Sequence, residues 1–201
     1  MKEKKRIRVL IDNGHGVETP GKCSPDRELR EYAWTREIAG RLMSKLVEAD
    51  FPVALVVAEE GDVRLRDRVK RVNSLAQGES VLVSIHVNAS GIGGFWRNPS
   101  GWSCYVAPNS SAKSKRLAEL LAREAEAHGL KLRRQYPDKG YWTQSLAMVR
   151  DTRCPAVLTE NLFMDNKDDC EFLLSEEGKQ AIVDLHFDAL KAYCSELSQA
   201  A

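Results

Sequence analysis

The sequence predicts an α/β fold: a single domain with a mostly parallel, twisted sheet flanked by helices on both faces. Short apolar runs typical of buried strands alternate along the chain with longer amphipathic stretches that have helical spacing. The chain has 201 residues, and its 43% hydrophobic and 29% charged residues are ordinary for one globular domain. We therefore expect one domain over residues 1–201, with a core from about residue 6 to 195.

The first half of the chain has five segments with the pattern of a strand or a helix. Strands are predicted over residues 7–12, 51–57 and 81–87, and helices over residues 30–48 and 63–77. The run 81–87 is almost unbroken and hydrophobic, as in the buried centre of a parallel sheet. Pro52 fits the first residues of its strand or a strand at the sheet edge.

The second half begins with a loop, over residues 89–101, that contains several glycines, Gly93 among them. Because this loop closely follows His86, we expect it to be flexible and to border a functional site. Strands are predicted over residues 102–107, 146–149 and 156–158, and helices over residues 112–128 and 176–197. Gly129 stands where a helix stop is expected. Residues 130–145 form a polar and aromatic connection.

Charge and composition exclude several functions. A formal charge of +1 gives no field that would attract a polyanion, so we expect no nucleic-acid partner. No window approaches the ~18 apolar residues of a membrane span. The basic start over residues 2–8 precedes an apolar run too short for a signal peptide, so we expect no export signal in this chain. We expect a monomer.

Five cysteines are present, an odd number, and none stands in a Cys-x-x-Cys pair. This pattern argues against a thiolate zinc site and against a compact disulfide framework. We expect free thiols, including Cys154, which opens an apolar run and fits a structural role better than that of a nucleophile.

Two histidines follow predicted strands and carry the functional hypothesis. His15 lies just beyond the run Arg8–Asp12, and His86 lies in the run 81–87. Ligands gather at the carboxyl ends of parallel strands, and neutral imidazole is a common zinc ligand. Glu160 ends the run 155–160 and points to the same edge. We therefore expect one zinc ion there, although two hydrogen-bonded structural histidines would give the same pattern.

A third ligand is needed, because hydrolytic zinc sites take three protein ligands and leave one position for water. The acids that follow His15 are candidates, and the residues alone leave Glu28 and Glu31 equally placed. Glu160 fits the general acid and base, and its alternative is a salt bridge to a nearby arginine. The acid candidates are Glu18, Asp26, Glu28 and Glu31, and the arginines are Arg150 and Arg153.

The other two histidines are expected to be structural. His128 ends a predicted helix, where an imidazole meets the helix carboxyl end favourably, and His186 lies within the last helix. Asn88 is predicted to share the strand side of His86 and to contact substrate, and a local turn role fits it equally. Tyr141 and Trp142 fit sugar stacking less well than core or lid packing.

From Arg8 to about Tyr193 the chain resembles the zinc-dependent N-acetylmuramoyl-L-alanine amidases of the amidase 3 type, which cut bacterial peptidoglycan. Its blocks stand in the order of that family. They are Gly14-His15-Gly16, Glu31 ahead of residues 38–42, residues 65–73, Ser84-Ile85-His86-Val87-Asn88-Ala89, and residues 148–152 with 155–166. Two positions depart from the usual pattern: Asn13 stands where Pro is frequent, and Asn161 where Gly is frequent.

The resemblance implies that His15, Glu31 and His86 hold the zinc ion, and so it favours Glu31 over Glu28. It also implies that Glu160 moves the proton while water cleaves the amide between the lactyl group of N-acetylmuramic acid and L-alanine. The implied partner is peptidoglycan, and the implied location is the cell wall, periplasm or exterior. Two alternatives are a zinc carboxypeptidase acting on wall peptides and a wall-binding module without catalysis.

Overall fold

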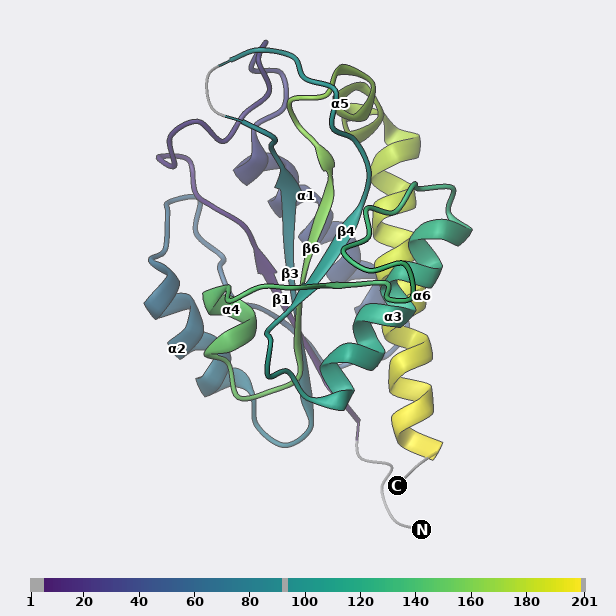
Figure 1. The fold of residues 1–201 in the computed structure, drawn as a ribbon. Coiled ribbons are helices and arrows are strands. Elements are labelled where there is room, and N and C mark those ends of the chain that lie inside the picture. Colours follow the sequence, from purple (N-terminus) through teal and green to yellow (C-terminus); the bar gives the residue numbers. More distant parts are fainter. Residues whose placement is uncertain (1–5, 92–93, 200–201) are drawn as a thin grey trace.

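The computed structural model describes residues 6–91 and 94–199, which form three layers with helices on both faces of one six-stranded sheet (Figure 1). The predicted α/β class and the mostly parallel sheet are confirmed. Residues 2–5 of the basic start, and Gly93 of the loop, lie outside the described residues.

Six strands follow one another across the sheet in the order β2-β1-β3-β6-β4-β5. All neighbouring pairs are parallel except β4, which is antiparallel to β6. Because β1, β3 and β6 are parallel neighbours, their carboxyl ends meet at one edge, the upper one in Figure 1. The strands are β1 (Arg8–Asn13), β2 (Val53–Leu55), β3 (Ser80–Asn88), β4 (Ser103–Val106), β5 (Trp142–Thr143) and β6 (Ala156–Phe163).

The helices divide into two layers, which Figure 1 shows on opposite sides of the sheet. Apolar side chains of the larger layer, such as Leu42 and Leu190, form one core with alternate residues of β1 and β3. Val72 and Met148 belong to a second core on the other face. The larger layer holds α1 (Glu31–Glu48), α3 (Ala112–Ala127), α5 (Lys167–Leu174) and α6 (Glu176–Gln199), and the smaller holds α2 (Leu65–Leu75) and α4 (Ala147–Arg150).

Strand β1 shows how the apolar runs produce these layers. Val9 and Ile11 pack into the larger core, while Leu10, between them, packs into the smaller one. Successive side chains of a strand point to opposite faces, so a strand covered by helices on both sides has to be apolar at every position. Strand β2 is at the edge of the sheet, and Pro52 precedes it, as expected for proline.

One predicted strand is wrong. The apolar run 146–149 is the helical turn α4, in which the Arg150 N–H donates to the Leu146 carbonyl at 2.9 Å. The Thr152 hydroxyl donates to the Met148 carbonyl at 2.8 Å. Four apolar residues fit a strand or a helical turn equally, and periodicity cannot distinguish them over this length. In the turn, the adjacent Met148 and Val149 are both buried on the same side of the sheet.

Strand β6 is longer than predicted and runs on to Phe163. Glu160 therefore lies inside the strand and not at its end. The polar residues 159–161 interrupt the apolar pattern, but β6 pairs with β3 on one side and with β4 on the other, which satisfies its backbone. Strand β5 and helix α5 were not predicted. For α5, Asn166 was a usable signal, because its side chain accepts from the Asp169 N–H at 3.0 Å as a helix cap.

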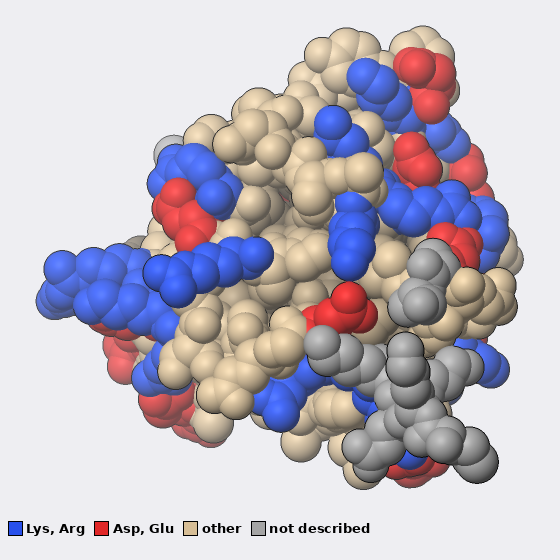
Figure 2. Space-filling model, turned by 90° about the horizontal axis from the view of Figure 1, so that it is seen from below, with Lys and Arg blue, Asp and Glu red and all other residues tan. Residues whose placement is uncertain are grey.

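Helix α3 ends as predicted: His128 is its carboxyl cap, and Gly129 follows with a φ of +80°. The end of the molecule opposite the carboxyl ends of β1, β3 and β6 bears basic and acidic groups side by side (Figure 2). Within residues 6–91 and 94–199, no helix combines the length and apolar character that crossing a membrane requires.

Candidate metal centre

His15 follows β1, and the residue before it packs against the other histidine. A Cβ added to Gly14 would lie 2.4 Å from Cε1 of His86, so a side chain at position 14 would displace that imidazole. His15 itself has a φ of +61°, in the left-handed region that most residues avoid. Its carbonyl accepts from Arg68 at 2.8 Å and from Arg36 at 3.2 Å. These two hydrogen bonds offset the backbone strain and hold the loop in place.

Arg68 of α2 is the main support of this loop, and the sequence analysis assigned it no role. Its guanidinium is 3% exposed and pairs with Asp12 at 2.9 Å. It also donates to the Asn13 carbonyl at 2.6 Å, and the other oxygen of Asp12 accepts from the Ser84 hydroxyl at 2.6 Å. Because the charge of Arg68 is both paired and hydrogen-bonded, its burial is tolerated. In the sequence, the acid Asp12 within an apolar strand was the one sign that a buried cation would be needed as its partner.

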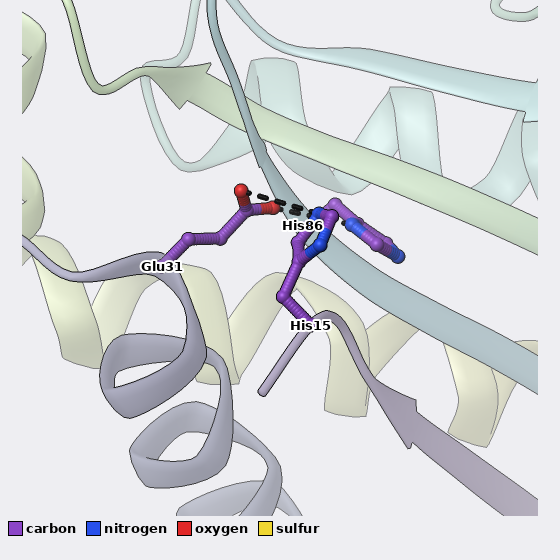
Figure 3. Close-up of side chains that lie close together, drawn as sticks. All are labelled: His15, Glu31 and His86. Atoms are coloured by element: carbon purple, nitrogen blue, oxygen red, sulfur yellow. Dashed lines mark hydrogen bonds and ion pairs between the residues drawn. The ribbon is translucent and has the colours of Figure 1, made fainter. Parts of the chain in front are cut away.

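Glu31 begins α1 and points toward the two histidines (Figure 3). Its carboxylate is 1% exposed. Oε1 accepts from the Val87 N–H at 3.0 Å and lies 3.1 Å from Nδ1 of His86. Oε2 lies 3.4 Å from Nε2 of His15 but has no hydrogen-bond partner in the part of the chain that the structure describes. A buried carboxylate oxygen without a hydrogen-bond partner is costly, so this position suits a cation.

The structure thus brings together the three residues expected to bind metal. One ligand atom from each of His15, Glu31 and His86 lies within 4.8 Å of the others. The two imidazole rings stand perpendicular, with their centroids 5.0 Å apart. Two imidazoles and one carboxylate from three different elements are a donor set that suits Zn²⁺ and leaves room for a non-protein ligand. The group can therefore hold a metal ion.

The electrostatics favour the metal-binding protonation states of His15 and Glu31. Burial lowers the pKa of the His15 imidazole to about 4, and the opposing charge of Glu31 does not restore it. Burial would raise the pKa of Glu31, but its hydrogen bond with His86 and the positive charge around it outweigh burial and hold that pKa below the usual range. Neutral imidazole and ionised carboxylate are the ligand forms. Burial would lower the pKa of His86, but its hydrogen bond with Glu31 and the negative charge of Glu31 outweigh burial and raise that pKa, so a metal ion has to displace a proton from His86.

Glu160 is the cross-strand neighbour of His86 in the parallel pair of β3 and β6. Side chains at such paired positions project from the same face of a sheet. Burial raises the pKa of the Glu160 carboxyl to about 7, against the opposing charge of His86. Its Oε2 is buried and has no hydrogen-bond partner among the described residues. Neither Arg150, which pairs with Asp151 at 2.6 Å, nor Arg153 forms the alternative salt bridge with Glu160.

Asn161 ties the backbone of His86 to the helical layer. Its amide donates to the His86 carbonyl at 2.9 Å and to the Thr159 hydroxyl at 3.2 Å. Its carbonyl oxygen accepts from the indole N–H of Trp102 at 2.8 Å. Thr159 in turn lies 3.0 Å from Nε2 of His186, whose Nδ1 donates to a helix carbonyl. The expected structural role of His186 agrees with this network.

The other acids predicted as possible ligands, and Asn88, make local hydrogen bonds or are exposed, and none of them belongs to the group of His15, Glu31 and His86. Glu18 accepts from the Asp62 N–H at 2.8 Å, Asp26 accepts from Ser24 at 2.6 Å, and Glu28 is exposed. The Asn88 side chain accepts from the Ala89 N–H at 2.9 Å, next to an irregularity in the register of β3. That hydrogen bond favours the turn role, and substrate contact by Asn88 stays a prediction.

Comparison with known proteins gives the family. A sequence profile described as N-acetylmuramoyl-L-alanine amidase matches residues 9–192. The chain belongs to this family. The chain is 30% identical over 186 residues to N-acetylmuramoyl-L-alanine amidase CwlM of Bacillus licheniformis and 28% identical over 190 residues to an endolysin of Bacillus phage SPP1. These alignments cover 92% and 90% of this chain but 67% and 64% of the relatives, so the chain spans about two thirds of their length.

A solved amidase structure confirms the fold. The catalytic domain of CwlV, an N-acetylmuramoyl-L-alanine amidase from Bacillus (Paenibacillus) polymyxa var. colistinus, superposes with a TM-score of 0.81 at 26% identity, over 94% of this chain and 98% of that one. The family assigned from the strand-end motifs is therefore confirmed. Of the two departures from the family pattern, Asn161 has a clear structural use, because its amide holds the His86 carbonyl.

Proposed function

We propose that this amidase-family chain is a zinc-dependent N-acetylmuramoyl-L-alanine amidase. In this proposal it cleaves the amide between the lactyl group of N-acetylmuramic acid and the L-alanine of the stem peptide in bacterial peptidoglycan. Residues 6–195 would form its catalytic domain, acting at the cell wall where the substrate lies. The group of His15, Glu31 and His86 beside Glu160 carries the proposal, in a chain whose relatives are named amidases.

The zinc site would be held by His15, Glu31 and His86. Its support is the buried Oε2 of Glu31, which has no hydrogen-bond partner among the described residues although two imidazoles and Lys22 stand near it. Zinc, when bound, supplies a Lewis acid that lowers the pKa of a water molecule toward about 7 and polarises the carbonyl of the scissile amide. The clamp of Arg68 on the His15 carbonyl keeps the first ligand in position.

Glu160 would move the proton. Its unpartnered Oε2 accepts a proton from the attacking water while the water oxygen bonds to the amide carbon. The same oxygen then donates that proton to the nitrogen of the departing L-alanine as the carbon–nitrogen bond breaks. The products are a lactyl carboxylate on the glycan and a stem peptide with a free amino end. Its place beside His86 brings Glu160 to the reacting atoms.

Digestion of purified sacculi tests the proposal. The zinc-loaded protein should release peptides whose mass and amino-terminal residue show an intact stem starting with L-alanine. Removal of zinc with a chelator should stop the release, and added zinc should restore it. Loss of carboxyl-terminal residues from the stem, with no free L-alanine amine, would show a carboxypeptidase. Binding to sacculi without release in the presence of zinc would show a wall-binding module, and either result would overturn the proposal.

A further inference from the structure

A hollow of about 880 Å³ lies beside the metal centre, between residues 17–32 and residues 89–91. Each metal-binding residue has a close chain neighbour in its wall. Val17 follows His15 by two positions, Arg30 and Tyr32 flank Glu31, and Ala89 follows His86 by three positions. Lys22, also in the wall, places its Nζ 3.9 Å from Oε2 of Glu31. The hollow therefore adjoins the place where the scissile bond would sit.

The charged side chains that line this hollow are all positive. Lys22, Arg27 and Arg30 line it, and its described lining residues include no Asp or Glu. Arg27 and Arg30 are exposed and take part in none of the ion pairs of the described residues. By contrast, Arg41 and Arg116 on the helical layer each hold a carboxylate, at 2.8 Å and 2.5 Å. Two guanidinium groups without a carboxylate, facing a hollow, are available to an anionic ligand.

The backbone that carries these cations is a closed hairpin. The Glu31 N–H donates to the Lys22 carbonyl at 2.9 Å, and the Ser24 N–H donates to the Leu29 carbonyl at 2.9 Å. Leu29 is fully buried and anchors the hairpin to the core. At its tip, Arg27 has a φ of +68°, where glycine would carry no steric cost. The hairpin ends on Glu31, so the backbone positions of its basic residues are fixed relative to the proposed metal centre.

We propose that this hollow is the subsite for the stem peptide and that Arg27 and Arg30 bind a free carboxylate of that peptide. The inference rests on the proposed amidase function and adds the orientation of the substrate. The two sides of the scissile amide differ in charge. On the glycan side, the one carboxyl group of N-acetylmuramic acid is used in the amide bond itself, and the sugars are neutral. On the peptide side, the stem carries free carboxylates, which guanidinium groups bind in bidentate fashion.

Lys22 faces both the hollow and the proposed metal centre. Its ammonium group already faces Glu31, so it belongs to the metal centre as much as to the hollow. Arg27 and Arg30 touch neither a metal-binding residue nor Glu160 through any side-chain contact that the structure describes. They are therefore the residues whose replacement reports on peptide binding alone. Both are exposed, so their replacement should leave the fold unchanged.

The test compares two substrates that differ only in charge. One is a soluble glycan fragment that carries stem peptides with free carboxylates, and the other is the same fragment after conversion of those carboxylates to amides. The enzymes are the wild type, Arg27→Gln, Arg30→Gln and the double variant, with Arg116→Gln as the matched arginine outside the hollow. Zinc content and melting temperature are measured for each, and all five proteins should bind zinc equally.

On the free-acid substrate, each single variant should lose about tenfold in kcat/KM and the double variant about 100-fold, mainly through KM. On the amidated substrate, the double variant should stay within about twofold of the wild type. Equal losses on both substrates, or wild-type kcat/KM of the double variant on the free acid, would overturn the subsite. The fragment contains no phosphate, so a loss seen only on sacculi with anionic phosphate polymers would also overturn it.

Failure of the amidase function itself would look different. In that case the wild type would release no peptide with an amino-terminal L-alanine from either substrate. If the wild type cleaves both substrates and the variants lose the same kcat/KM on each, the subsite is refuted and the amidase function stands.

Discussion

The four histidines of this chain lie in two regions that differ in how their partners are satisfied. At the strand ends, His15 and His86 share one buried acid, Glu31, and one oxygen of that acid has no hydrogen-bond partner among the described residues. In the helical layer, His186 is fully buried, whereas the side chains of His15 and His86 are 21% and 15% exposed, and both ring nitrogens of His186 have partners, at 2.7 Å and 3.0 Å. The most buried histidine is therefore the one whose polar atoms are already satisfied.

His128 shows that proximity to acids does not distinguish a metal ligand from a structural histidine. Glu124, His128 and Asp188 also place one ligand atom each within 4.8 Å of the others. Glu124, however, pairs with Arg123 at 2.7 Å, and the Asp188 carboxylate is 45% exposed. One acid of this group is thus paired with an arginine, and the other is open to solvent. The two regions therefore differ in one property: the strand-end group contains a buried acid with an oxygen that has no hydrogen-bond partner among the described residues, and the helical group does not. For this reason we expect zinc at the strand ends only.

The largest expected effect follows from Glu160→Gln. The amide of glutamine keeps the shape of the side chain but cannot accept the proton of the attacking water. Release of stem peptides from sacculi should fall by about 100-fold to 10,000-fold, while zinc stays bound. Peptide release and zinc content, measured on the same sample, check this. Release at a near-normal rate would remove Glu160 from the chemistry.

The second prediction concerns zinc binding, which should differ between the two regions. His86→Ala removes one of the three proposed ligands, so the zinc dissociation constant should rise by about 100-fold or more, and the thermal stabilisation by zinc should disappear. His128→Ala is the matched control and should keep the stoichiometry and the melting temperature of the wild type with zinc. Loss of one zinc ion in the His128 variant instead would show that the helical group binds metal.

Acid stability should distinguish the buried His186. Burial lowers its pKa to about 4. Below about pH 6.5 the unfolded chain binds a proton at this residue and the native protein does not, so stability is lost as pH falls from about 6.5 to 4. The loss from this residue should reach about 3 kcal/mol. Urea unfolding of zinc-free wild type and His186→Gln should show the smaller pH slope in the variant, and equal slopes would contradict the account.

The smallest expected effect concerns Asn161, whose hydrogen bonds connect the backbone of His86 to Trp102. Asn161→Ala leaves the His86 carbonyl and the Trp102 indole without their partner, and should lower the free energy of unfolding by about 2 kcal/mol. Asn73 is the matched control, because its exposed amide also bonds to backbone on both sides, to Asp151 and Arg153. Asn73→Ala should cost less than about 1 kcal/mol. Equal costs in urea unfolding would show that the buried network adds nothing.

The sequence predicted those parts of the fold and the site that local patterns determine. Apolar runs placed β1 and β3, and with them both histidines at one edge of the sheet. The choice of Glu31 over Glu28 needed the family resemblance, because both acids lie near the start of the same predicted helix. The structure separates them: Glu31 is buried beside the two histidines, and Glu28 is exposed.

Features that depend on tertiary contacts could not be predicted from local pattern. Arg68 is distant in sequence from the carbonyl of His15 that it holds, and nothing in its own helix shows that it is buried. Asn161 interrupts an apolar strand and acquires its role only from Trp102 and the backbone of β3. The short run that became α4 had no periodicity long enough to separate a strand from a helical turn.

Zinc binding at the strand ends is tested by a crystal structure of the protein grown with zinc, with anomalous data collected on both sides of the zinc absorption edge. We expect one strong anomalous peak, within about 2.0–2.2 Å of a ring nitrogen of His15, a ring nitrogen of His86 and a carboxylate oxygen of Glu31. No peak at these three residues, or the only peak at Glu124, His128 and Asp188, would contradict this expectation.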